Sequence, residues 1–301
     1  QREPRSGRET RATRRERRRL PTMHTPPLSS AVPSIVFIGG GNMAGALIGG
    51  WVRSGRPAAA LQVVEPAPQA RDQLLSTWGV GGVAHAAEAA LECAQVVVWA
   101  VKPQVFAAAA AACAGRAAPA LHLSVMAGVR SAAIARATGA QRVVRCMPNT
   151  PALIGRGIAG LQATAAVAAD DRARVDQLLA PTGELLWLDR ESDLDAVTAL
   201  SGSGPAYVFY VVEALIEAAV TMGLTEAQGR QLALATFDGA TALARQSSES
   251  PAVLRERVTS KGGTTHAALE SLRADGVHLA LQRAVLAARQ RARELGDELE
   301  R

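Results

Sequence analysis

The chain has 301 residues, 48% of them hydrophobic and 20% charged, and a formal net charge of +6 at pH 7. This length and apolar fraction are enough for about two domains with buried cores, and they exclude a chain that is disordered throughout. Residues 1–22 contain nine arginines and three glutamates, which account for the whole net charge. We therefore expect residues 1–33 to be a disordered basic tail and linker, followed by an electroneutral body for which nucleic acid is not the expected partner.

The three cysteines show neither CxxC spacing nor neighbouring histidines, so we expect no metal site and no disulfide framework. The alanine-rich segment 96–114 comes closest to a membrane span, but Lys102 and Pro103 interrupt it. We therefore expect a cytoplasmic protein without a membrane segment.

Short apolar runs, many of them rich in β-branched residues, alternate with helical stretches from residue 34 to about residue 190. The strands predicted from these runs cover residues 34–38, 61–64, 96–100, 121–125, 143–146 and 185–188. Strands that alternate with helices pair in parallel through right-handed crossovers. The first half is therefore expected to be an α/β domain with a parallel sheet.

The pattern changes at about residues 189–192, after which apolar residues recur at helical spacing. Helices are predicted over residues 193–200, 207–222, 226–244, 252–258, 265–272 and 277–295. The segment from Tyr207 to Val220 is apolar on nearly every face, so we expect it to be buried all round. A domain of about 110 residues has difficulty covering such a helix alone, which indicates a partner subunit.

The first predicted strand ends at Gly39-Gly40-Gly41-Asn42-Met43-Ala44, which fits the G-x-G-x-x-A form of the dinucleotide-binding fingerprint. Gly39 permits a tight turn, Gly41 lets the backbone approach a pyrophosphate, and Ala44 allows the helix to pack closely on the strand. The N-terminus of the helix supplies free N–H groups for the phosphates. The motif opens the first βα unit, and in this position it predicts dinucleotide binding.

Glu65 ends the second predicted strand, where an acidic side chain accepts hydrogen bonds from a ribose 2′-hydroxyl. This favours NAD, because a carboxylate repels a 2′-phosphate, although the following Pro66 could turn the side chain outward. Arg71, the nearest cation, is interpreted as a solvated helix residue.

Further strand ends should border the cofactor, because ligands of open α/β sheets bind beyond the carboxyl ends of strands. After the third strand these residues are Ala100, Lys102 and Pro103. Segments 124–128 and 145–151 follow later strands, and the second ends in a rigid turn between two prolines with two small polar side chains aimed above the sheet.

Two glycine-containing segments precede helices in the second half. Residues 201–205, SGSGP, fit either a flexible hinge or a helix entry with Pro205 in the first turn. Residues 259–265, TSKGGTT, place successive backbone N–H groups at a helix N-terminus, which suits a carboxylate, and Ser260 and Thr265 add hydroxyl donors. Helix capping alone would explain the same pattern.

Taken together, five motifs resemble the Δ1-pyrroline-5-carboxylate reductase family: FIGGGNMAGALIGG, AVKPQ, RCMPNTP, LSGSGPAY and VTSKGGTTHAAL, in this order and spacing. The similarity extends from about Ile35 to Leu295, and the last motif is highly specific to the family. The resemblance implies a Rossmann-type dinucleotide-binding domain over residues 34–190, followed by an all-α substrate-binding and dimerisation domain over residues 191–301. It also implies NADPH as reductant, with NADH as the alternative, and homodimers that assemble into a decamer.

The resemblance implies the site residues as well. Substrate contacts carry over onto Ser260 and Thr265, expected to be catalytic, and onto the backbone of Gly262, Gly263 and Thr264. Cofactor contacts carry over onto Gly39, Gly41, Asn42, Met43, Ala44, Ala100, Lys102 and Pro103. The chain departs from the family at Ala86 and Ala87, where many members have an Asn, and at Lys261, where some have Pro. Glu65 leaves the choice between NADPH and NADH open.

The implied reaction reduces L-1-pyrroline-5-carboxylate to L-proline, the last step of proline biosynthesis. The sequence offers no evident general acid, since His266 at a helix start is interpreted as a surface residue. We expect catalysis by positioning, with the glycine loop anchoring the substrate carboxylate and Thr265 hydrogen-bonding the ring nitrogen.

Two other interpretations remain. A β-hydroxyacid dehydrogenase shares the two-domain plan, but such enzymes present a catalytic lysine from a helix, whereas Lys261, the only lysine of the helical half, lies in a predicted loop. A non-catalytic nucleotide-binding or nucleic-acid-binding module is the alternative from another class, and the neutral body disfavours nucleic acid unless the basic tail alone binds it.

Overall fold

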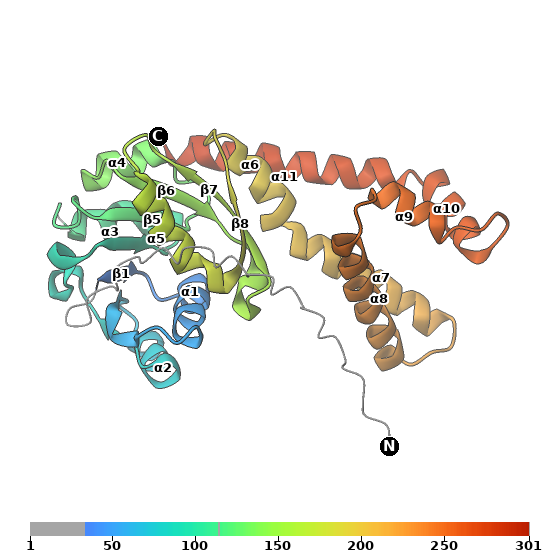
Figure 1. Cartoon of the computed structure of the whole chain (residues 1–301), viewed down its shortest axis with the longest axis horizontal. Coiled ribbons are helices and arrows are strands. Elements are labelled where there is room, and N and C mark those ends of the chain that lie inside the picture. Colours follow the sequence, from blue (N-terminus) through green and yellow to red (C-terminus); the bar gives the residue numbers. More distant parts are fainter. Residues whose placement is uncertain (1–33, 114, 301) are drawn as a thin grey trace, which may run out of the picture.

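The computed structural model describes residues 34–113 and 115–300. The predicted basic tail and linker, residues 1–33, therefore lies outside the described residues. Figure 1 shows a sheet with helices on both faces and a helical part that extends away from it.

Within the described residues the sheet has eight strands in the order β3-β2-β1-β4-β5-β6-β7-β8. The strands are β1 (Ile35–Ile38), β2 (Leu61–Val64), β3 (Gly81–Val83), β4 (Val96–Trp99), β5 (Leu121–Ser124), β6 (Val143–Met147), β7 (Gly157–Ala163) and β8 (Gly183–Trp187). The first six in this order pair in parallel. The chain order reverses between β1 and β4, and in such sheets ligands bind at the carboxyl ends of the strands beside this switch point.

Two strands were not predicted, and the prediction of an all-parallel sheet is wrong at one edge. β3 is mostly glycine and β7 is rich in glycine and alanine, so neither has the run of large apolar residues from which a strand was predicted. β7 runs antiparallel to β6, and β8 is parallel to β7. The chain reaches β7 through the short segment η5 (Thr150–Ile154), and a connection without a crossover helix can return the chain only in the opposite direction.

In the part of the chain that the structure describes, the helices that cover the sheet are α1 (Asn42–Arg53), α2 (Pro68–Trp78), α3 (Phe106–Cys113), α4 (Ser131–Thr138) and α5 (Ala169–Leu179). Two hydrophobic clusters separate the layers. One joins the sheet to α1, α2 and α5, and the other joins it to α3 and α4. Successive β1 residues divide between them, with Ile35 and Phe37 in the first and Val36 and Ile38 in the second. A strand buried on both faces is expected in such a three-layer domain.

From β8 to residue 300, the end of the described chain, the second half contains helices and no strand, as predicted. It comprises α6 (Asp193–Val197), the π-helical segment η7 (Thr198–Gly202), α7 (Gly204–Thr221), α8 (Glu226–Gln246), α9 (Pro251–Arg257), α10 (Thr264–Ala274) and α11 (Val277–Leu299). Pro205 lies in the first turn of α7, which confirms the helix-entry interpretation of SGSGP. The predicted fold class, an α/β Rossmann-type domain followed by a helical domain, is confirmed.

Helix α11 connects the two parts of the molecule. It starts beside α10 at the far helical end and returns to the sheet domain near α4 (Figure 1). Near its end Leu299 packs on the cluster that covers one face of the sheet. Arg130, at the N-terminus of α4, forms ion pairs with Asp297 and Glu300, so both polar and apolar contacts hold the end of α11.

Within a single chain α7 is not buried all round, so the burial that the sequence predicts depends on the partner subunit that the sequence also indicates. Phe209 and Tyr210 are 65% and 74% exposed, and α7 buries only Val212 and Ala219. Within the described residues, one helical stretch, Asp193–Thr221, is long and apolar enough to cross a membrane by length and composition, and 11% of its apolar window is buried. Those two properties do not distinguish a membrane span from a helix that packs against another subunit.

Candidate functional site

The turn between β1 and α1 has the geometry that the glycine motif predicts. Gly39 has a φ angle of +101°, and a Cβ at this position would lie 2.7 Å from the carbonyl oxygen of Ala100. Any other residue would strain the turn and displace the end of β4. A Cβ at Gly41 would meet no atom within 4 Å, so this glycine leaves open space above the turn. Ala44 is fully buried where α1 packs on the sheet.

Helix α1 begins with unpaired donors. Its N-cap, Gly41, has no side chain to cap it, and the first helical bond runs from the Gly45 N–H to the Gly41 carbonyl at 2.9 Å. Among the described residues, the N–H groups of Asn42, Met43 and Ala44 therefore have no backbone acceptor. Free N–H groups at the positive end of a helix form an anion site. The turn and the helix start together can accommodate a pyrophosphate.

A cavity of about 620 Å³ opens at the carboxyl ends of β1, β2 and β4. Five predicted cofactor residues line it: Gly39, Gly41, Glu65, Ala100 and Lys102. The other four lie next to it along the chain, with Asn42, Met43 and Ala44 in the first turn of α1 and Pro103 at the start of η4 (Pro103–Val105). Alanines of residues 84–87 and of α3 form much of the remaining wall. A mostly apolar cavity with a few polar groups, next to an open glycine turn, fits a nicotinamide dinucleotide.

Glu65 does not turn outward at Pro66. Its Oε2 accepts the Gly40 N–H at 2.9 Å, and its Oε1 accepts the Ala67 N–H at 3.0 Å. Arg71, interpreted as a solvated helix residue, is partly exposed on α2, and its guanidinium donates to the backbone carbonyls of Glu65 at 2.6 Å and Pro66 at 2.8 Å. Both side chains are therefore held against the β2–α2 turn.

The turn after β6 joins the two domains through Asn149, whose role the sequence did not identify beyond a polar side chain above the sheet. The Asn149 Nδ2 donates to the Ser201 carbonyl at 3.1 Å, and its Oδ1 accepts the Ile158 N–H at 3.0 Å. A Cβ at Gly202 would lie 2.6 Å from the Met147 Cε, so η7 approaches the end of β6 closely. The side chain of Asn149 thus fixes the entry into the helical domain relative to the sheet.

The predicted substrate loop lies at the N-terminus of α10. Gly262 has a φ angle of +75°, and Gly263 is the N-cap. The Gly263 N–H donates to the Ser260 carbonyl at 3.0 Å, so it is occupied within the turn and does not serve as the free donor that the sequence predicted. The first helical bond, from the Ala267 N–H to the Gly263 carbonyl, leaves the next three N–H groups without backbone acceptors in the described chain. This loop can accommodate a carboxylate.

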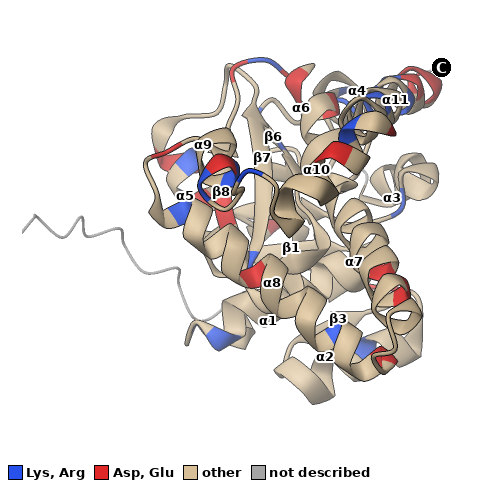
Figure 2. Cartoon of the chain, turned by 90° about the vertical axis from the view of Figure 1, so that its right-hand side faces the viewer, with Lys and Arg blue, Asp and Glu red and all other residues tan. Residues whose placement is uncertain are grey.

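One chain does not bring the cavity and this loop together. Figure 1 shows α10 at the far helical end, with the length of α11 between it and the sheet domain. Figure 2 views this end and shows long uncharged stretches along α7, α8 and α10. The predicted cofactor residues and the predicted substrate residues therefore lie at opposite ends of the folded molecule.

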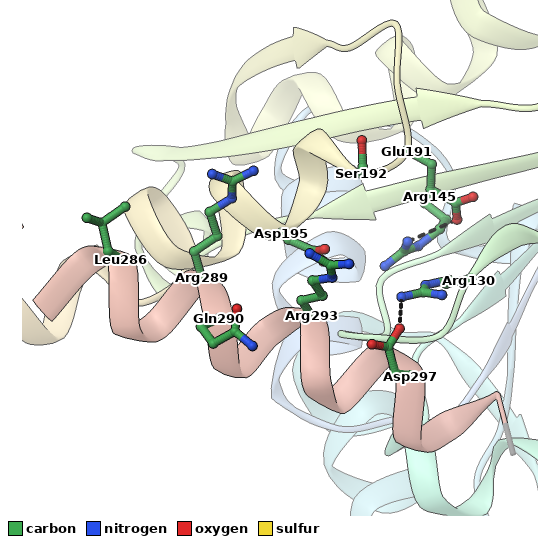
Figure 3. Close-up of a pocket in the computed structure, with 10 residues that line it drawn as sticks. All are labelled: Arg130, Arg145, Glu191, Ser192, Asp195, Leu286, Arg289, Gln290, Arg293 and Asp297. Atoms are coloured by element: carbon green, nitrogen blue, oxygen red, sulfur yellow. Dashed lines mark hydrogen bonds and ion pairs between the residues drawn. The ribbon is translucent and has the colours of Figure 1, made fainter. Parts of the chain in front are cut away.

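A second cavity, of about 750 Å³, lies where α11 meets the sheet domain, and charged side chains line it (Figure 3). Two arginines from the sheet domain form ion pairs in the wall of this cavity, Arg145 with Glu191 at 2.9 Å and Arg130 with Asp297. Burial alone would raise the pKa of Glu191, but hydrogen bonds from the Ser131 N–H and from Arg145 lower it below its ordinary value. These pairs serve to hold the two parts of the chain together.

The fold and the first cavity define a two-domain oxidoreductase with a nicotinamide-dinucleotide site at the first βα turn and a helical second domain. Comparison with known proteins agrees with this class. Residues 34–128 match the family described as NADP oxidoreductase, coenzyme F420-dependent. Residues 191–295 match the family described as pyrroline-5-carboxylate reductase dimerisation.

Full-length relatives give the particular family. The chain is 43% identical over 271 residues to the pyrroline-5-carboxylate reductase of Pseudomonas aeruginosa, covering 89% of this chain and 99% of that protein. It is 37% identical to the same enzyme of Corynebacterium melassecola, covering 87% and 98%. The chain belongs to the pyrroline-5-carboxylate reductase family. The motif resemblance is confirmed, and the β-hydroxyacid dehydrogenase alternative is wrong.

Solved structures agree with this assignment. The pyrroline-5-carboxylate reductase of Coxiella burnetii superposes with a TM-score of 0.81 at 34% identity, covering 88% of this chain and 98% of that one. The pyrroline carboxylate reductase of Plasmodium falciparum, solved with NADP bound, has a TM-score of 0.78 at 26% identity, covering 89% and 99%.

Proposed function

We propose that this chain reduces L-1-pyrroline-5-carboxylate to L-proline with NAD(P)H, the last step of proline biosynthesis. The observation that carries the proposal is the mostly apolar cavity at the glycine turn, in a member of this family that also has the TSKGGTT loop. We take residues 34–190 as the cofactor domain and residues 191–301 as the substrate and dimerisation domain. The end of β8 at Trp187 and the start of α6 at Asp193 support this division.

The cofactor is held by the nine predicted residues around the glycine turn, β2 and β4. Bound NAD(P)H supplies the hydride. The free N–H groups of Asn42, Met43 and Ala44 bind the pyrophosphate, and the open space above Gly41 admits it. The apolar wall excludes water along the rest of the cavity.

The α10 loop binds the substrate carboxylate. Thr264 and Thr265 offer backbone N–H groups, and the hydroxyls of Ser260 and Thr265 make no other hydrogen bond within the described residues. Gly262 keeps the turn open at a φ angle that side chains rarely adopt. The Thr265 hydroxyl then donates to or accepts from the ring nitrogen while the loop fixes the carboxylate, so the chain acts mainly by positioning.

The complete site is formed by two chains. We propose a homodimer in which the α10 loop of one chain lies over the cofactor cavity of the other. The apolar exposed face of α7 and the distance along α11 between loop and cavity support this arrangement. The family match of residues 191–295 to a dimerisation region supports it as well. Assembly of the dimers into a decamer remains a proposal, which sedimentation analysis tests.

We propose a cytoplasmic location. Three free cysteines, of which Cys113 and Cys146 are buried, suit a reducing compartment. Fractionation of the producing cells with an antibody against the chain tests this, and recovery with the membranes would contradict it.

The function is tested by following NADPH and NADH oxidation with pyrroline-5-carboxylate, run side by side. Turnover with neither cofactor would contradict the proposal. Thr265→Ala should lower kcat/KM about tenfold or more, because a hydrogen bond to the reacting ring is lost. Thr259→Ala is the matched control, since the Thr259 hydroxyl only caps the Arg255 carbonyl beside the same loop. Wild-type kcat/KM in the Thr265 variant would remove its assigned role.

A further inference from the structure

The β2–α2 turn contains an anion position that the chain fills with its own side chain. The Glu65 carboxylate, half-buried at the end of β2, is bound by two backbone N–H groups, those of Gly40 and Ala67. Ala67 is the N-cap of α2, so Glu65 occupies the positive end of that helix. A Cβ at residue 40 would lie 3.2 Å from the Glu65 Cγ and 3.1 Å from the Leu74 Cδ1, and glycine there lets the carboxylate approach the turn.

The cation nearest to this position does not face the cavity. Within the described residues, both hydrogen bonds of Arg71 run from its Nη1 to main-chain carbonyls, those of Glu65 and Pro66, and Arg71 does not line the cavity. Among the residues that the structure describes, the one lysine or arginine that lines the cavity is Lys102, which comes from the loop after β4. Lys102 is thus at the opposite side of the switch point from the β2 end. Glu65 is therefore the charged group that the cavity presents at the end of β2.

We propose that Glu65 makes this chain discriminate against a 2′-phosphate, so that it binds NADH more tightly than NADPH. The inference rests on the cofactor site of the proposed function. In a dinucleotide site of this fold the adenosine ribose lies at the end of the second strand. A ribose 2′-hydroxyl donates a hydrogen bond to the fixed carboxylate, whereas a 2′-phosphate meets a like charge and finds both N–H donors already occupied.

The preference belongs to this turn and not to the fold. The Plasmodium falciparum relative is described with NADP bound, so the architecture as such admits a 2′-phosphate. A rival explanation is that Glu65 only braces the glycine turn through Gly40. If Glu65 only stabilised the turn, its loss would weaken the binding of NADH and of NADPH by the same factor.

Dissociation constants measured by calorimetry on the full-length protein, without substrate, separate these explanations. For wild type we expect NADPH to bind about tenfold or more weakly than NADH. Glu65→Gln keeps the shape of the side chain and one acceptor but removes the charge. It should lower the dissociation constant of NADPH about tenfold and change that of NADH by no more than about twofold. Adenosine 2′,5′-bisphosphate and 5′-AMP should show the same difference, which assigns it to the 2′-phosphate.

Two further variants sharpen the experiment. Glu88 lies in the neighbouring segment η2 (Ala86–Glu88), where its carboxylate accepts the His85 N–H and does not line the cavity. Glu88→Gln should therefore leave the ratio of the NADH and NADPH dissociation constants unchanged. Arg71→Ala should also leave the ratio unchanged. Tighter binding of NADPH than of NADH by wild type, an equal effect of Glu65→Gln on both cofactors, or a selective loss of NADPH in Arg71→Ala would each overturn the proposal. A chain that fails to reduce pyrroline-5-carboxylate would contradict the proposed function and leave these binding constants measurable.

Discussion

A site shared between two chains predicts that two inactive variants restore activity when they form one dimer. Gly41→Asp should inactivate the cofactor cavity. The backbone at Gly41 has a φ angle of −71° and open space beyond it, so the side chain fits without strain and places a carboxylate where the pyrophosphate approaches. At about 4 Å and an effective dielectric constant of about 20, two like charges repel by about 4 kcal/mol, which weakens binding about a thousandfold.

Thr264→Glu should inactivate the substrate loop. Thr264 is exposed at the first position of α10, where a carboxylate favours the helix but competes with the substrate carboxylate for the same N–H groups. Each variant alone should fold and lack turnover. In a mixed dimer one site combines the intact cavity of the Thr264→Glu chain with the intact loop of the Gly41→Asp chain. The other site contains both substitutions.

The expected recovery follows from counting. With random assortment about half of the dimers are mixed, and one of their two sites works, so coexpression should restore about one quarter of the wild-type turnover per dimer. The assay is NAD(P)H oxidation with pyrroline-5-carboxylate on dimers purified after coexpression. Each variant coexpressed with itself is the control. If the mixture stays as inactive as its components although mass spectrometry shows mixed dimers, the site lies within one chain and the reasoning fails.

Three further predictions concern the stability and reactivity of the chain. Burial raises the pKa of the Cys146 thiol to about 12, so in the native protein a disulfide reagent should modify the exposed Cys93 and leave Cys146 intact until unfolding; fast native labelling of Cys146 would contradict this. Arg130→Ala should speed amide exchange in the last turns of α11 about fivefold, because its pairs with Asp297 and Glu300 are partly exposed and contribute about 1 kcal/mol; unchanged exchange would show that apolar packing alone holds this end. Burial lowers the pKa of His122, so on acidification the unfolded chain binds a proton at a higher pH than the folded chain does. Below about pH 6.5 the free energy of unfolding should therefore fall by up to about 1.4 kcal/mol per pH unit. Urea unfolding at several pH values should show a smaller fall in the free energy of unfolding for His122→Gln.

The sequence predicted those parts of the site that depend on neighbouring residues. The glycine turn is local, since Gly39, Gly41 and Ala44 are fixed by the strand before them and the helix after them. The strands with β-branched runs were predicted for the same reason. β7 was missed because its glycines and alanines carry no such pattern, and its pairing with β6 depends on the whole edge of the sheet.

The contacts of Glu65 could not be predicted, because its partner Gly40 lies 25 residues away and the hydrogen bond depends on how β2 pairs with β1. The sequence left open whether the side chain turns outward at Pro66. Nor could the hydrogen bond from the Gly263 N–H to the Ser260 carbonyl be predicted, because the same sequence is compatible with a turn in which this N–H is free.

The exposure of α7 within one chain bears on the mechanism. An apolar helix such as Gly204–Thr221 predicts burial, but hydrophobic periodicity does not specify which chain supplies the cover. Within this chain, exposed apolar side chains along α7 and a substrate loop remote from the cofactor cavity occur together. A second copy that covers α7 and also brings its own α10 loop to the cavity resolves both at once. On this argument the dimer contact contributes to catalysis directly, because a monomer that kept every side chain of the site would still hold the hydride donor and the substrate at opposite ends.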